Sequence, residues 1–146
     1  MDEKVTRLKT PDECERFAVN VREKYPALAK EARRRAVELR AAAYGAKTAA
    51  ELEALQAVYA YEEVLSSKKG KRIHASRTWQ MIRRHGIIGA VERAVNRESE
   101  TAGYKALVEM GMQDFAFEAV IARYPELFSP EAVKHAKARV EEWSRA

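Results

Sequence analysis

Residues 48–65, TAAELEALQAVYAYEEVL, form the stretch that decides the fold of this chain. Thr48 and Glu51 have the spacing of a capping box, in which each side chain accepts a hydrogen bond from the other residue's backbone amide at a helix start. A helix that is apolar on most sides must be covered by other elements. We therefore expect this helix to be the most buried one, because more than half of its circumference is apolar: Leu52, Leu55, Val58, Tyr59, Tyr61, Val64 and Leu65.

Two helices are predicted before this stretch. Thr10 and Pro11 are typical of a helix start, and Pro26 ends that helix and can begin the next. The second of these helices runs to Tyr44 and carries alanines at intervals of three and four residues. This spacing permits close packing against a neighbouring helix.

After residue 65 the apolar pattern breaks over 66–71, a polar stretch with a glycine, which we interpret as a linker. A helix then begins at residue 75 or 76 and ends at His85-Gly86, and Ile87 and Ile88 are interpreted as turn residues. A short helix follows over 89–96. Three further helices are predicted, with glycine or proline ending the first two.

No segment alternates with a period of two, so no sheet is expected. We predict an all-α fold: a single compact domain over residues 1–146 with six to eight helices, long in the N-terminal half and short in the C-terminal half. A candidate subdomain junction lies at 66–75. Trp79 and Trp143 take core-facing positions, so we expect both to pack inside the protein.

The basic residues are concentrated in one segment. The chain has a formal net charge of +5, but residues 68–97 alone hold nine basic residues and one acidic residue, a charge of +8. Residues 1–67 are neutral, and residues 98–146 carry −3. Such a local excess favours a polyanionic partner. Arg33, Arg34 and Arg35 form a second cluster, which we interpret as a solvated helix face with local pairs to Glu31 and Glu38.

The predicted function is nucleic-acid binding through phosphate contacts, with DNA favoured over RNA. We interpret 68–77 as a mobile basic loop that reads no sequence. If it neutralised about six phosphates, the logarithm of the affinity would fall with the logarithm of salt with a slope near −5. The predicted contact residues lie in this loop and the adjoining helical hairpin: Lys68, Lys69, Lys71, Arg72, His74, Ser76, Arg77, Arg83, Arg84, Arg93 and Arg97.

Residues 79–95 also fit a helix-turn-helix in outline, because Gly86 falls in the turn. However, Ile82 stands four residues before this glycine, where a small residue normally lets the two helices cross closely. An ordinary helical hairpin with a basic outer face is the preferred interpretation.

Two other functions stay open. A metal-independent nuclease would use His74 and His85 for proton transfer and Arg77 and Arg84 to stabilise charge. We lean against an enzyme, and predict no catalytic residues, metal or cofactor. The single cysteine, Cys14, excludes an intrachain disulfide and a Cys-rich zinc site.

The third candidate is a protein-interaction module, such as an inhibitor or an antitoxin-like partner. The C-terminal third combines acidic and aromatic residues, which suit a basic protein surface: Glu109, Asp114, Phe115, Phe117 and Glu118. The N-terminal residues MDEKVTRLKT lack the apolar core of a signal peptide. No apolar run approaches the about 20 residues of a membrane span. The expected location is the cytoplasm, without membrane contact.

Five strings of this sequence resemble a family of uncharacterised bacterial all-helical proteins: CERFAVN, ARRRAVELRAAAYGA, VYAYEEVLS, RIHASRTWQMIRRHGIIGAVERAV and GYKALVEMGMQDFAFEAV. The resemblance spans roughly Thr10 to Ser129. It implies an all-helical fold and carries no function, catalytic residue or binding residue.

Overall fold

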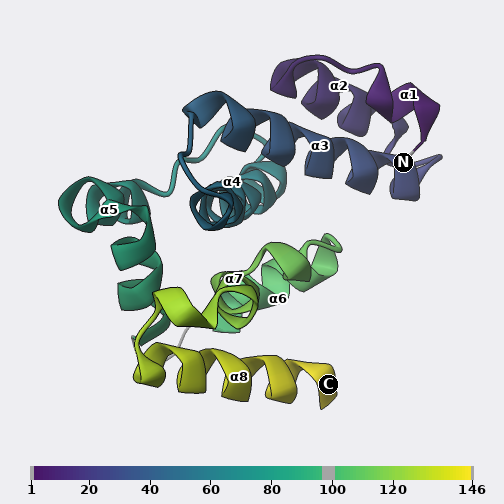
Figure 1. Ribbon diagram of the computed structural model, residues 1–146. Coiled ribbons are helices and arrows are strands. Elements are labelled where there is room, and N and C mark those ends of the chain that lie inside the picture. The colour runs from purple at the N-terminus through teal and green to yellow at the C-terminus, as the bar shows by residue number, and fades with distance from the viewer. Residues whose placement is uncertain (1, 97–100, 146) are drawn as a thin grey trace.

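The computed structural model describes residues 2–96 and 101–145, with the side chains of residues 2–96 and 105–142. Within these residues the chain is helical and has no strand (Figure 1), so the predicted all-α class is confirmed. Helices α3 and α4 have 19 and 21 residues, α5 spans 21 residues with a break at Gly86, and α6 to α8 have 7 to 16. The elements in chain order are α1 (Glu3–Thr6), α2 (Pro11–Val21), α3 (Pro26–Tyr44), α4 (Ala49–Lys69), α5 (Ser76–Asn96), α6 (Thr101–Glu109), the 3-10 helix η1 (Gln113–Phe115), α7 (Phe117–Arg123), the 3-10 helix η2 (Pro125–Leu127) and α8 (Pro130–Arg145).

Helix α4 is the centre of the fold, as its sequence predicts. The Thr48 hydroxyl caps it by accepting a hydrogen bond from the Glu51 amide at 3.1 Å. Ten residues of α4 are buried, and Leu55 and Val64 are fully so. The helix packs against α3, α5, α6, α7 and η1, and Figure 1 shows it between the α1–α3 layer and the α6–α8 layer.

The predicted linker at 66–71 is largely wrong, because α4 continues through Lys69 and ends at Gly70, which has a left-handed conformation with φ 70°. Ser66 is buried and its hydroxyl accepts a hydrogen bond from the Ile73 amide at 2.8 Å. This bond ties the following loop back onto α4. Lys68 and Lys69 sit in the last helical turn, where positive charge is favoured by the helix dipole. The basic loop is therefore shorter than expected and is held to the core.

The interpretation of the three arginines of α3 as a solvated face is also wrong, since each makes a tertiary contact. Arg33 is buried and donates to Glu63 at 3.1 Å. Arg34 forms a two-pronged pair with Asp114 at 2.9 and 2.5 Å. The Nε of Arg35 donates to the carbonyl of Leu8 at 2.8 Å. These contacts fasten α3 to α4, to η1 and to the segment before α2.

The apolar core has several parts. One lies between α1, α2 and α3, around Val5 and Ala18, and others join α4 and α5 to the C-terminal helices, around Val91 and Ile121. Trp79 is partly buried and packs against the cluster of Val58, Ile82 and Ala90, and Trp143 lies outside the described side chains. None of the described helices has the length and apolar composition that crossing a bilayer requires.

Candidate nucleic-acid interface

Helix α5 bends at Gly86, and the bend creates the candidate site. Gly86 has φ 79° and ψ 171°, a backbone conformation that essentially only glycine adopts, inside an otherwise helical run. Residues 76–85 form a first arm and residues 87–96 a second arm, which turns away from the first (Figure 1). Ile87 and Ile88 belong to the second arm, so their interpretation as turn residues is wrong. A bend at one residue also lacks the turn of a helix-turn-helix.

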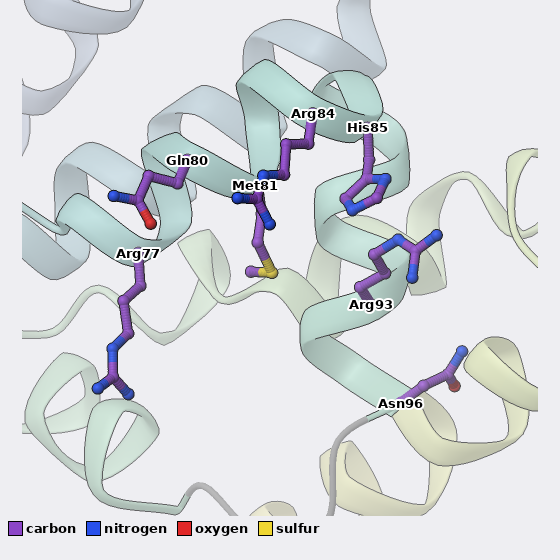
Figure 2. Close-up of a pocket in the computed structure, with 7 residues that line it drawn as sticks. All are labelled: Arg77, Gln80, Met81, Arg84, His85, Arg93 and Asn96. Carbon is purple, nitrogen blue, oxygen red and sulfur yellow. The ribbon is translucent and has the colours of Figure 1, made fainter.

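A cavity of about 690 Å³ opens in the angle between the two arms. Arg77, Gln80, Met81 and Arg84 lie on one face of the first arm, because helical residues three and four apart are neighbours. His85 stands at the bend, and Arg93 and Asn96 come from the second arm, as Figure 2 shows. We call this cavity the basic pocket.

The basic pocket has no acidic residue among its described lining. No described carboxylate forms a salt bridge with Arg77, Arg84 or Arg93, whereas many of the other arginines have such a partner. Three guanidinium groups that share one hollow repel each other, and a concave surface concentrates their field. The pocket is therefore suited to an anion with several charges.

Glu92 is the one acid of α5, and it is not among the lining residues of the basic pocket. It accepts hydrogen bonds from the Ser129 amide at 2.8 Å and from the Asn96 side-chain amide at 3.1 Å. Burial opposes its ionisation, but the bonds from Ser129 and Asn96 outweigh it and hold the pKa of Glu92 below its ordinary value. Its carboxylate thus anchors the start of α8, and it forms no salt bridge with Arg77, Arg84 or Arg93.

The residues predicted for nucleic-acid contact are divided over the surface. Arg77, Arg84 and Arg93 meet in the basic pocket, while Lys71, Arg72 and His74 line a different cavity of about 460 Å³. Lys68 pairs with Glu109 at 3.2 Å. The others lie outside the basic pocket: Lys69, Ser76 and Arg83 are exposed, and Arg97 falls outside the described residues.

Arg72 has a structural role. Its guanidinium reaches Glu15 at 3.3 Å, Glu62 at 3.2 Å and Glu63 at 3.5 Å, and both of the last two carboxylates are 1% exposed. Glu62 also accepts from the Ala75 amide and from the indole nitrogen of Trp79, each at 2.7 Å. We call Glu15, Glu62, Glu63, Arg33, Arg40 and Arg72 the charge cluster. Replacement of Arg72 tests the stability of the fold more than contact with a ligand.

Trp79 is held by this cluster and by two tyrosines. Its ring stacks on Tyr44 with centroids 5.8 Å apart and packs against Tyr59 at 5.2 Å. The bond from its indole nitrogen to Glu62 fixes the first arm of α5 onto α4. Arg77 and Arg84 of the basic pocket thus lie on an arm that is held against α4, and a binding site benefits from such a fixed support.

The structure brings together only some of the residues that the nuclease hypothesis needs. Arg77, Arg84 and His85 share the basic pocket, but His74 lines the other two described cavities. Among the described residues, no group of three or more His, Cys, Asp or Glu side chains is placed to hold a metal ion.

Sequence reasoning missed Gln80 and Met81 as pocket residues. The spacing of residues 77, 80, 81 and 84 could have predicted that they line the same pocket, because residues at these intervals lie on one face of a helix. Comparison with known proteins found no match for this chain among family models, curated proteins or solved structures. The resemblance to a bacterial family stays a prediction.

Changing Gly86 tests the bend. We expect Gly86→Ala to lower the free energy of unfolding by about 1–3 kcal/mol, because the added Cβ meets no neighbour but forces a strained backbone. Gly86→Asn should be equally costly, since asparagine tolerates the left-handed region but not ψ near 180°. Gly70→Asn is the control: at φ 70° and ψ 15° it should cost less. Urea unfolding gives these values, and equal costs for the two asparagine variants would contradict the strain at residue 86.

Proposed function

We propose that this protein binds nucleic acid, and DNA before RNA, by placing backbone phosphates in the basic pocket. The observation that carries the proposal is the meeting of Arg77, Arg84, Arg93 and His85 around one hollow with no described acid. Guanidinium groups donate two parallel hydrogen bonds to phosphate oxygens and keep their charge at all working pH values. The rigid arms fix the spacing of the arginines before the ligand arrives, which lowers the entropy cost of binding.

The contact is electrostatic and does not depend on base sequence. Phosphate contacts position a nucleic acid without reading it, and neither arm forms a recognition helix of a helix-turn-helix. Lys69, Lys71 and Arg83 are exposed and extend the positive field without shaping the pocket. We assign the protein to the cytoplasm within this proposal.

The protein-interaction alternative has less support. Its acidic residues are engaged within the chain: Asp114 with Arg34, Glu118 with Arg139 at 2.9 Å and Glu109 with Lys68. Phe115 is buried under the Arg34 guanidinium, which lies 4.2 Å from its ring centre. These groups leave little of the predicted acidic, aromatic surface for a partner.

Charge reversal of the pocket tests the proposal. We expect the variant Arg77→Glu/Arg84→Glu/Arg93→Glu to lose at least about tenfold in affinity for DNA at about 50 mM salt, because three phosphate contacts become repulsive. Fluorescence anisotropy with an end-labelled oligonucleotide measures the affinity. Circular dichroism verifies that the variant is folded.

A matched control separates the pocket from the net charge. The exposed residues Arg16, Lys24 and Lys30 lie outside the described lining of the basic pocket. Each replacement by Glu lowers the net charge by two. The control and the pocket variant therefore both change the net charge of the chain from +5 to −1. The control should retain most of its affinity. Equal losses in the two variants, or no binding by the parent protein, would refute the proposal.

A further inference from the structure

A second cavity adjoins the basic pocket and shares Arg77 and Met81 with it. Its volume of about 560 Å³ lies in the range of cavities that accept small organic groups. Its walls come from α4, both arms of α5, α6, α7 and α8. A ligand that lies along the basic pocket therefore reaches this second cavity at Arg77.

The second cavity differs from the basic pocket in having largely apolar walls. Val58 and Tyr61 of α4 contribute one side, and Phe117 of α7 contributes another. Ala94 and Val95 of the second arm of α5 present small side chains that leave the space open. Two aromatic rings in an apolar hollow suit a flat, weakly polar group.

Three hydroxyl groups also line this cavity, from Tyr61, Ser76 and Thr78. None of the three has a hydrogen-bond partner among the described residues. The only described carboxylate of the lining, Glu118, is held by Arg139 at 2.9 Å. The cavity thus offers both apolar faces and free donor–acceptor groups at its edges.

We infer that this second cavity receives one unpaired base of a single-stranded nucleic acid whose neighbouring phosphates lie in the basic pocket. The inference rests on the proposed function and narrows its ligand to a single strand. A base has flat faces for Tyr61 and Phe117 and polar edges for the hydroxyls. Arg77, which faces both cavities, contacts the phosphate that joins the inserted base to the next nucleotide.

Two other occupants fit less well. A purely apolar molecule would leave the three hydroxyls unpaired and would gain nothing from Arg77. A base in a duplex is stacked and paired, and removing it from the helix costs free energy that a single strand does not spend. The same cavity therefore predicts that single strands bind more tightly than duplexes at equal length and salt.

The decisive experiment compares three ligands of equal backbone length with the parent protein: oligo(dT), the same strand with abasic sites throughout, and a duplex. Anisotropy at one salt concentration gives the three affinities. The abasic strand keeps the phosphates and lacks the bases. We expect oligo(dT) to bind about tenfold more tightly than the abasic strand, because stacking of one base contributes about that factor in affinity. We also expect oligo(dT) to bind more tightly than the duplex.

A cavity-filling variant locates the effect. Ala94→Phe places a ring in the second cavity, and we expect it to reduce the affinity for oligo(dT) to the level of the abasic strand, whose own affinity should be unchanged. Ala122→Phe, at an exposed position of α7, is the control and should behave like the parent. Tyr61→Phe removes one hydroxyl with little change of shape, and we expect a smaller loss, about threefold, for oligo(dT) alone.

The outcomes separate this inference from the proposed function. Equal affinity for oligo(dT) and the abasic strand overturns base insertion and leaves phosphate binding intact. A preference for oligo(dT) that Ala94→Phe leaves unchanged in the folded protein also overturns it, because the base then lies elsewhere. No binding of any strand refutes the proposed function, and the inference fails with it.

Discussion

Glu62→Ala is expected to lower the free energy of unfolding by about 3–5 kcal/mol, the range seen when one partner of a buried ion pair is removed. Glu62 is 1% exposed and accepts hydrogen bonds from Arg72, from the Ala75 amide and from the Trp79 indole. Its removal leaves these three donors without that acceptor and separates the first arm of α5 from α4. Urea unfolding followed by circular dichroism measures the loss.

Two comparisons refine this prediction. Glu62→Gln keeps the shape and one carbonyl acceptor but removes the charge, so its cost should lie between those of the parent and Glu62→Ala. Glu23→Ala removes an exposed carboxylate and should change stability by less than about 0.5 kcal/mol. A cost of Glu62→Ala as small as that of Glu23→Ala would show that the charge cluster does not hold α5 in place.

The second large effect is a dependence of stability on pH that originates at Glu63. Burial, then the charge of Glu15 and a hydrogen bond with it, raise the pKa of Glu63 to about 7, while Arg33 opposes the shift. Its ordinary value is 4.5. Arg72 also donates to this carboxylate, and its other terminal nitrogen donates to Glu62.

The direction of this pH dependence follows from the number of protons that the folded and unfolded states bind. Between pH 4.5 and about 7 the folded protein keeps a proton on Glu63 that the unfolded chain has lost, so stability falls as the pH rises through this window. The full effect of a shift from 4.5 to about 7 is on the order of 3 kcal/mol. Arg34 lowers the pKa of Asp114 below its ordinary value of 3.8, so Asp114 affects stability at lower pH. There, protonation of Asp114 lowers the stability as the pH falls.

Glu63→Gln tests this assignment, since glutamine does not titrate. The variant should lose most of the decline in stability between pH 5 and pH 8, as measured by urea unfolding at several pH values. Glu53→Gln, on the same helix and paired with Arg123, is the control and should keep the decline. An undiminished slope in Glu63→Gln would assign the pH dependence to other groups.

The sequence predicted the fold where local signals agree with tertiary packing. Thr48 and Thr10 cap their helices as expected, each accepting from the amide three residues later at 3.1 Å. Of the apolar residues predicted for α4, Leu55, Val58 and Val64 are buried. The others are partly buried: Leu52, Tyr59, Tyr61 and Leu65. The end of α4 was predicted too early because a polar residue such as Ser66 is typical of a linker. In the structure the Ser66 hydroxyl accepts a hydrogen bond from the Ile73 amide, so the residue stays in the helix.

The basic residues show why a site is harder to predict than a helix. Arg33, Arg34 and Arg72 have the same local appearance as Arg77, Arg84 and Arg93, but their carboxylate partners are 9 to 80 positions away in the chain. Periodicity does not reveal such distant partners. The break at Gly86 was predicted, because a glycine after a histidine is typical of a helix end, but the second arm begins at Ile87 and not after Ile88. Only the fold separates arginines that are neutralised from those that face an open pocket.

The salt dependence of DNA binding tests the central claim, that Arg77, Arg84 and Arg93 each neutralise a phosphate. For a single strand, three contacts predict that the logarithm of the affinity falls with the logarithm of salt with a slope of about −2. Arg84→Gln should make this slope less negative by about 0.7–1, and Arg16→Gln should leave it unchanged. A slope that Arg84→Gln and Arg16→Gln leave equally unchanged would contradict the phosphate-binding role of the basic pocket.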